Sequence, residues 1–344
     1  MGQSKMQFGI MQRGVFPWKE DIRKRFEELM EQARTLEKLG YDSITKGSHF
    51  STFPHREMTQ IPYLCRVIAE APSLRLNAGI VLLSLHNPLE VAEYFATMDL
   101  MSNGRTIFGC ALGYRDVEYK GFGVKKGQGV PRFEENLEAI KQLWTGEPVT
   151  MQGQHFELDE ARISVPLVQS PRPPIWMGAN VDNAVKRAAR LADCWYLNPH
   201  QKLETLRRQM DIYREELNRI GKPFPDELPI RREVFCARTH EEAVETAAPH
   251  IKGMYDLYKE WGQDRAMAKG DQDITMAYEE LAKDRFIVGD PDEVAAEMLR
   301  YNTELGVNHI IMSVQGTGMP QAQTLETFQL MAEEVFPKVR AAME

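Results

Sequence analysis

The feature that most constrains the fold is a repeat in which a short apolar run is followed by a loop, an amphipathic helix and a turn. Continuous apolar runs such as 74–83 are typical of strands that helices cover on both faces. Eight such runs lie near residues 8–13, 41–46, 74–83, 105–112, 174–178, 193–197, 229–236 and 307–314. Eight strands that alternate with helices favour an α/β fold of the (β/α)8 TIM-barrel type.

Two of the intervening helices carry clear end signals. Residues 22–39 have apolar side chains at steps of three and four and are followed by a glycine, as expected of a helix with a C-terminal glycine cap. The last clear unit has Asp290 as N-cap, Pro291 at the first helical position and Glu293 three residues after the cap, and it ends at Gly306. This combination predicts a helix over 291–305.

The length of the chain leaves room for insertions in one domain. It has 344 residues, whereas a TIM barrel uses about 250. Residues 147–173 show the alternation of a β-hairpin and a Pro-rich exit, and residues 250–288 indicate extra helices with a charged loop. We find no repeat or linker, so we expect a single domain over 1–344.

The alternative fold is a doubly wound sheet, which would need a Gly-rich fingerprint after the first strand. Residues 9–17 contain only two glycines, which weakens that alternative.

Charge and hydropathy exclude two classes of partner. The chain has 42 Lys and Arg against 50 Asp and Glu, a net charge of −8 without a local basic patch, so we expect neither nucleic acid nor an anionic membrane as partner. The longest nearly pure apolar run, Ala78–Leu85, is far shorter than the roughly 20 residues of a membrane helix, and no signal peptide is visible. We expect a cytoplasmic protein whose four unpaired cysteines are mostly buried.

Candidate site residues are those that directly follow the apolar runs, because a TIM barrel builds its site from these loops. His49 follows the second run, where an imidazole can donate to a ligand or act as general acid or base; alternatively, it only bonds a neighbouring loop. Gly113 would let the backbone approach a flat ligand, and Tyr114, Arg115 and Glu118 then supply an aromatic ring, a cation and a carboxylate. The alternative is a turn with a solvated charge pair.

A third candidate is the turn Gly178-Ala179-Asn180, which precedes a helix rich in Arg and Lys. Free amides at a helix N-terminus bind anions such as phosphate, although small-residue turns are also common connections. No histidine lies at metal-ligand spacing, and we find neither a nucleophile elbow nor a Walker loop. We therefore expect no metal site, and the chemistry would come from a bound cofactor.

The ordered set of motifs resembles the bacterial luciferase-like family of flavin-dependent oxidoreductases, and most of all its limonene-monooxygenase-like branch. The resemblance covers nearly the whole chain. Its main segments are Asn87-Pro88, Ser102-Asn103-Gly104-Arg105, Gly113-Tyr114-Arg115 with Glu118, Pro173-Pro174-Ile175-Trp176-Met177-Gly178 and Val288-Gly289-Asp290-Pro291.

The resemblance implies a TIM barrel, often dimeric, that binds reduced FMN or the deazaflavin F420 at the carboxyl ends of the strands. It also implies that Ala78–Gly79 is the family's non-prolyl cis peptide bond beneath the isoalloxazine ring. The cofactor-binding residues would then be Ala78, Gly79, Gly113, Tyr114, Glu118, Gly178, Ala179 and Asn180.

The chain departs from the light-emitting members at three points. Ser48-His49 stands where those members carry paired histidines, so we do not expect luminescence. Leu112 stands at the position of the arginine that helps to hold the flavin phosphate in luciferases. Ala179 and Asn180 replace acidic and hydroxyl residues. Phosphate binding would therefore depend on backbone amides.

The expected function is an FMN-dependent monooxygenase that receives reduced FMN from a separate NAD(P)H:flavin reductase. It would use O2 to oxidise a small, apolar organic substrate through a C4a-(hydro)peroxyflavin, with His49 and Arg115 stabilising developing negative charge. Residues 250–288 would form a lid that excludes water, and the protein would be a homodimer. Two alternatives stay open: an F420-dependent dehydrogenase or reductase, and a non-catalytic partner subunit like the luciferase β chain.

Overall fold

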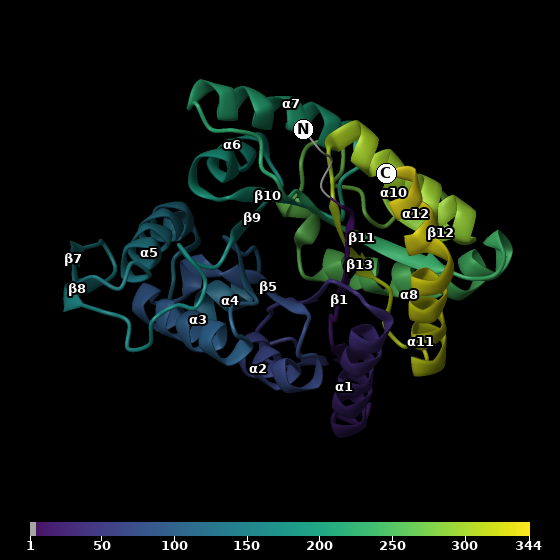
Figure 1. Cartoon of the computed structure of the whole chain (residues 1–344), viewed down its shortest axis with the longest axis horizontal. Coiled ribbons are helices and arrows are strands. Elements are labelled where there is room, and N and C mark those ends of the chain that lie inside the picture. Colours follow the sequence, from purple (N-terminus) through teal and green to yellow (C-terminus); the bar gives the residue numbers. More distant parts are fainter. Residues whose placement is uncertain (1–4) are drawn as a thin grey trace.

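The computed structural model describes residues 5–344, and its centre is a closed barrel of eight parallel strands (Figure 1). In chain order these are β1 (Gln7–Met11), β3 (Ser43–Lys46), β5 (Arg75–Leu82), β6 (Thr106–Ala111), β9 (Ile175–Ala179), β10 (Cys194–Leu197), β11 (Pro229–Cys236) and β13 (His309–Ser313). Each strand pairs in parallel with its neighbours in this order. The ring closes because β1 pairs with β13 as well as with β3. The predicted TIM barrel is confirmed.

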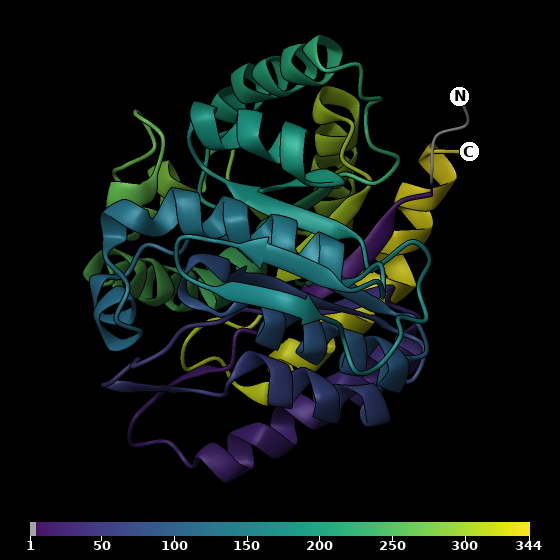
Figure 2. The same cartoon turned by 90° about the vertical axis from the view of Figure 1, so that its left-hand side faces the viewer.

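Helices surround the barrel on its outer side (Figures 1 and 2). They are α1 (Ile22–Leu39), α2 (Gln60–Glu70), α3 (Pro88–Ser102), α4 (Asp116–Gly121), α5 (Gly129–Leu143), α6 (Asp182–Leu191), α7 (Leu203–Arg219), α8 (His240–Glu260), α9 (Tyr278–Ala282), α10 (Pro291–Leu305), α11 (Gln321–Leu330) and α12 (Phe336–Ala342). Short 3-10 turns lie at η1 (Leu83–Leu85), η2 (Lys126–Gln128) and η3 (Gln263–Ala266), and the π turn η4 (Met331–Val335) joins α11 to α12. Figure 2 shows α12 beside β1, where the rings of Phe8 and Phe336 stack at 3.8 Å.

The end signals in the sequence are confirmed as caps. Gly40 ends α1 in the left-handed conformation, with φ 72°, which glycine adopts without a steric cost. At α10 the Asp290 carboxylate accepts from the amides of Asp292 and Glu293, and the Glu293 side chain accepts from the Asp290 amide. Helix α1 therefore ends, and helix α10 begins, at the residue that the sequence predicts.

The two regions predicted as insertions contain a hairpin in the first case, and helices and a strand in the second. Residues 147–173 contain the antiparallel hairpin of β7 (Val149–Gln152) and β8 (Glu157–Ala161), as expected. In the second region, α8 already starts at His240, and the segment ends in a strand, β12 (Phe286–Gly289), which pairs in parallel with the C-terminal half of β11. A further small antiparallel pair joins β2 (Val15–Pro17) to β4 (His55–Glu57).

The non-prolyl cis peptide bond lies one bond later than expected, between Gly79 and Ile80 rather than between Ala78 and Gly79. Ala78 still pairs regularly with Lys46 on one side and Phe108 on the other. The regular ladder to β6 is interrupted only after it, because Val81 pairs with Cys110. The cis bond thus falls inside this bulge, which adds one residue to β5 relative to β6.

Three of the four cysteines are buried as expected, while Cys65 is half-buried, and all four are free thiols. In residues 5–344, none of the helices has the length and apolar character that crossing a membrane requires.

Candidate functional site

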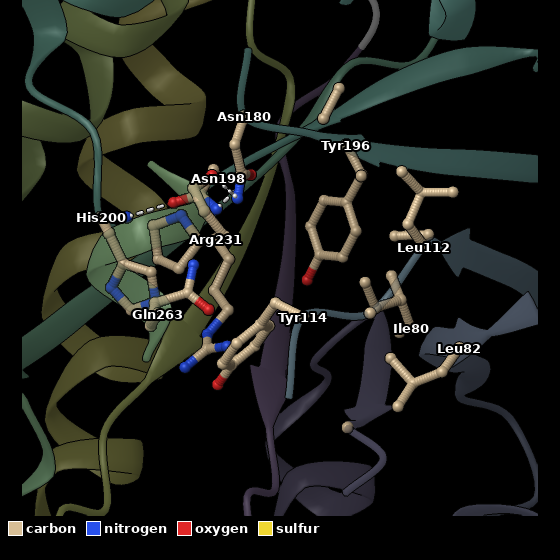
Figure 3. Close-up of a pocket in the computed structure, with 18 of the residues that line it drawn as sticks. Ile80, Leu82, Leu112, Tyr114, Asn180, Tyr196, Asn198, His200, Arg231 and Gln263 are labelled. Carbon is tan, nitrogen blue, oxygen red and sulfur yellow. Dashed lines mark hydrogen bonds between the residues drawn. The ribbon is translucent and has the colours of Figure 1, made fainter. Parts of the chain in front are cut away.

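A cavity of about 260 Å³ opens at the carboxyl ends of the barrel strands (Figure 3). Every barrel strand except β13 contributes lining residues directly or through the loop that follows it, and α6, α8 and η3 cover its outer side. Seven of the ten predicted site residues line this cavity: His49, Gly79, Gly113, Tyr114, Gly178, Ala179 and Asn180. The sequence-based choice of loops therefore converges on one place.

The cavity has an apolar wall and a polar wall. Figure 3 shows Ile80, Leu82 and Leu112 on one side, and Asn180, Asn198, His200, Arg231 and Gln263 on the other. The apolar residues come from β5 and the end of β6, whereas Arg231 comes from β11. Because β5 and β11 are four strands apart in a ring of eight, these walls face each other across the barrel.

Glycines leave the backbone bare along much of the lining. Gly47, Gly79, Gly113 and Gly178 all border the cavity. Gly113 has φ 81°, a left-handed conformation that side-chain-bearing residues rarely adopt. A planar ligand can therefore approach the backbone after β6 more closely than it could approach a side chain.

His49 is fixed by a buried carboxylate. Its Nδ1 lies 3.0 Å from Oε1 of Glu118, and the same oxygen accepts from the amide of Phe50 at 3.0 Å. Glu118 is only 1% exposed. A neutral His49 donates from Nδ1 to this carboxylate, which leaves Nε2 as an acceptor. The predicted His49 is thus held in one orientation at the cavity.

Arg115 and Glu118 lie behind the cavity wall rather than on it. The Arg115 guanidinium donates to the carbonyls of Phe50 and Ser51, at 2.7 and 3.3 Å, and lies 4.3 Å above the Trp261 ring. Its Nη1 is 3.3 Å from Glu118. Neither residue lines the cavity, and neither does Ala78. Arg115 and Glu118 can therefore act only through His49 and the loop that carries it.

The predicted lid region closes one side of the cavity. Tyr258 and Trp261 from the end of α8, and Gln263 and Ala266 from η3, are part of the lining. The Trp261 ring meets the His49 ring edge-on at 4.9 Å. The segment is therefore in contact with the candidate catalytic histidine. Whether it opens stays a prediction.

The turn after β9 is held in place by amide side chains. Asn180 donates to the carbonyl of Ala266 at 3.1 Å and accepts from Asn198. Helix α6 then starts at Asp182 without a side-chain cap on its first amides. Arg187, one turn further on, lines the cavity and bonds Glu134 at 2.7 Å. The free amides at the start of α6 and one cation thus lie together beside the cavity.

Ion pairs inside the barrel form a group that the sequence analysis missed. We call Arg13, Lys46, Glu57, Arg231 and Glu233 the inner charge cluster. Arg13 is paired with Glu233, and Lys46 contacts Glu57 at 2.8 Å. Arg231 donates to Tyr258 and Ser313, both at 2.9 Å. The signal that could have revealed the cluster is the run Arg231-Arg232-Glu233 inside an otherwise apolar strand.

Burial shifts the titration of two cavity residues. Desolvation raises the pKa of Tyr114, so its hydroxyl stays protonated. Burial, together with the nearby charges of Arg231 and Arg13, lowers the pKa of His200 well below its usual value. His200 is therefore neutral at physiological pH. Within residues 5–344, no group of three or more His, Cys, Asp or Glu side chains is arranged to hold a metal ion.

The barrel with its cavity at the carboxyl ends of the strands defines the chain as a TIM-barrel protein with a site of the type that binds small ligands. Residues 6–309 match the model of the luciferase-like monooxygenase family. The chain belongs to this family, as its sequence motifs predicted.

The relatives with assigned activities include both F420-dependent and flavin-dependent enzymes. The chain is 27% identical, over 91% of its length and 95% of the relative's, to an F420-dependent glucose-6-phosphate dehydrogenase of Amycolatopsis mediterranei. It is 23% identical, over 91% of its length and 89% of the relative's, to the oxygenase component of a flavin-dependent trigonelline monooxygenase of Acinetobacter baylyi.

Among solved structures, the oxygenating constituent of 3,6-diketocamphane monooxygenase from Pseudomonas putida, solved with FMN, superposes with a TM-score of 0.82. It is 19% identical, with 97% of this chain and 98% of that chain covered. This likeness shows the fold, and the family as a whole uses FMN or F420. The chain therefore belongs to an oxidoreductase family that includes both flavin-dependent and F420-dependent enzymes.

Proposed function

We propose that the chain is the oxygenase component of a two-component, FMN-dependent monooxygenase. When bound, reduced FMN would supply the electrons that activate O2 for transfer of one oxygen atom to an organic substrate. A separate NAD(P)H:flavin reductase would supply the reduced FMN. The trigonelline relative is likewise the oxygenase component of a flavin-dependent monooxygenase.

The residues of the cavity fit FMN. The apolar wall of Ile80, Leu82 and Leu112, with bare backbone at Gly113, can face a planar ring. The free amides at the start of α6, with Arg187, can hold a phosphate. The amide side chains of Asn180 and Asn198 supply polar groups on the opposite side.

The choice of FMN over F420 rests on the charge of the outer side of the cavity, which α6, α8 and η3 form. F420 has an acidic tail that needs several cations along its path. Arg187 is the one cation among the cavity-lining residues of α6, α8 and η3, and it is already paired with Glu134. One cation with helix amides matches the single phosphate of FMN better than it matches a polyanionic tail. The F420 relatives keep hydride transfer as the second candidate.

This chain's residues would contribute orientation and water exclusion. His49, fixed by Glu118, presents Nε2 as a proton acceptor. After it takes up a proton, the same nitrogen can donate to a developing negative charge. Trp261 and Tyr258 cover the cavity and keep bulk water from the reacting atoms. Arg115 and Glu118 would be positioning residues because they reach the cavity only through His49.

Anaerobic titration with reduced FMN and, separately, with reduced F420 tests the proposal, followed by mixing with oxygenated buffer in a stopped-flow instrument. We expect tight binding of reduced FMN and a transient change in flavin absorbance upon mixing.

The substitution Arg187→Gln should weaken the binding of reduced FMN about tenfold, because it removes a charged hydrogen bond to the phosphate. Arg190→Gln is the matched control, since Arg190 lies on the same helix and pairs with Glu216. Binding of F420 without a reaction with oxygen would contradict the proposal and favour hydride transfer.

A further inference from the structure

The inner charge cluster holds one positive charge that no carboxylate of residues 5–344 neutralises on its own. Its three cations, Arg13, Lys46 and Arg231, face two carboxylates, Glu57 and Glu233. Lys46 and Glu57 form one pair, and Arg13 takes Glu233. Arg231 is 3.7 Å from that same Glu233 carboxylate. A buried charge without its own partner is costly, which points to a partner that is not part of the protein.

The guanidinium of Arg231 has an open side. Nε donates to Oγ of Ser313 and Nη2 donates to the hydroxyl of Tyr258, each at 2.9 Å. Both acceptors are hydroxyl groups rather than carboxylates, so they orient the guanidinium without forming an ion pair with it. Nη1 makes no hydrogen bond to any residue in the range 5–344, and Arg231 lines the cavity. A planar guanidinium with a free edge is suited to a carboxylate.

Apart from the Glu233 carboxylate that Arg13 shares, the described surroundings of Arg231 add no compensating negative charge. His200, on the same wall, is neutral because burial and the nearby arginines lower its pKa. The next residue, Arg232, bonds the carbonyls of Asn198, Pro199 and Gln201 rather than a carboxylate. The whole chain carries a net charge of −8, so the positive charge is a local property of this wall.

The position of Arg231 separates this feature from the proposed phosphate site. Arg231 is the third residue of β11 and pairs in register with Ile311 of β13, so it lies inside the barrel. Arg187 belongs to α6 on the outer side. A molecule lying between the two walls would have its apolar body against Ile80 and Leu112 and one end at Arg231 (Figure 3).

We propose that Arg231, with the inner charge cluster behind it, binds a carboxylate of the substrate, so that the substrate is a small organic acid with an apolar body. This names the substrate class for the proposed monooxygenase and rests on it for the reaction. The anion site itself is a property of the cavity and can be tested without turnover.

The test uses benzoate and benzamide, which have similar shapes but differ in charge, and measures their binding to the full chain by isothermal titration calorimetry. We expect the wild type to prefer benzoate. Arg231→Gln should weaken benzoate binding roughly 10- to 100-fold, the usual effect of losing a charged hydrogen bond, and change benzamide binding little. Arg231→Lys should retain a preference for benzoate, which also guards against a folding defect in the glutamine variant. Arg190→Gln, which removes an arginine of α6 that pairs with Glu216 and does not line the cavity, should leave benzoate binding unchanged.

Three results would overturn the assignment. One is equal binding of benzoate and benzamide by the wild type. The second is loss of benzoate binding in Arg187→Gln but not in Arg231→Gln. The third is weaker binding of reduced FMN, with unchanged benzoate binding, in Arg231→Gln, because the anion would then be the reduced flavin ring. If neither FMN nor F420 binds but the benzoate pattern holds, the proposed function fails while the anion site stands.

Discussion

Glu118 and His49 are joined by a 3.0 Å hydrogen bond between a fully buried carboxylate and an imidazole on the cavity wall. The two residues are 69 positions apart. His49 lies on the loop that follows β3, and Glu118 lies on α4, which follows β6. The carboxylate also accepts from the amide of Phe50, so it holds both the ring and the backbone of the His49 loop. This arrangement makes Glu118 the residue that sets the orientation of His49.

Glu118→Gln should therefore lower kcat about tenfold. A hydrogen bond to a charged acceptor is worth about 1.5–3 kcal/mol against about 0.5–1.5 kcal/mol for a neutral one, and a difference of about 1.4 kcal/mol is tenfold in rate. Steady-state kinetics with a saturating reductase would measure it. Binding of reduced FMN should stay unchanged, because Glu118 does not line the cavity. Asp116→Asn, an exposed carboxylate on the same helix, is the control; equal kcat values for the two variants would contradict the positioning role.

Trp261→Ala should uncouple flavin oxidation from substrate oxidation. The ring covers His49 at 4.9 Å and lies 4.3 Å from the Arg115 guanidinium, so its removal opens the cavity to water. We expect a several-fold higher yield of hydrogen peroxide per reduced flavin consumed, measured by a peroxidase assay. Trp18→Ala removes an exposed tryptophan that does not line the cavity and should leave the yield unchanged. Unchanged coupling in Trp261→Ala would count against the lid.

The barrel could be predicted from the sequence because apolar runs mark buried strands, and all eight barrel strands are largely buried. It missed β12, since the run Phe286–Gly289 is only four residues long and lies in a region with helical composition. The cis bond was placed one position early because a bulge is a property of two paired strands, and neither strand alone shows it.

The candidate site was predicted where a residue directly follows a strand, as with His49 and Gly113. Arg231 was not predicted as a site residue because it lies within a strand. Its distances to Tyr258 and Glu233 depend on the closure of the barrel. Glu118 was identified as a functional residue, but its contact with His49 joins α4 to the separate loop after β3. Spacing along the chain cannot give such a contact.

Asp290→Ala should destabilise the protein by about 0.5–2 kcal/mol, the usual cost of losing an N-cap side chain. Asp290 accepts from the amides of Asp292 and Glu293 at 2.9 and 3.0 Å. These amides lose their acceptor in the alanine variant. Urea unfolding followed by circular dichroism would measure the change. Asp290→Asn keeps an acceptor oxygen and should lie close to the wild type, so equal destabilisation by the two substitutions would show that the cap is not the cause.

Glu227 should make the barrel less stable in acid. It lies beside the amino ends of the strands and links His309 of β13, at 2.8 Å, to Arg75 of β5, at 2.5 Å. Burial alone would raise the pKa of Glu227, but the hydrogen bonds from His309 and Arg75 outweigh it and lower the pKa to about 2. A carboxyl whose folded pKa lies below its unfolded value stabilises the fold at pH values above the unfolded pKa. That contribution is lost as the pH falls from about 4.5 towards 2.

The lowered pKa of Glu227 corresponds to at most about 3.5 kcal/mol, at about 1.4 kcal/mol per pKa unit. Glu227→Gln should therefore be less stable than the wild type at pH 7, and the difference should shrink steadily between about pH 4.5 and pH 2. Thermal unfolding at half-unit pH steps would measure it. Glu326→Gln, an exposed carboxyl on α11, should show no such trend. A difference between wild type and Glu227→Gln that stays constant down to pH 2 would mean that the variant loses packing rather than the ionised carboxylate, and the link from β13 to β5 would then not depend on charge.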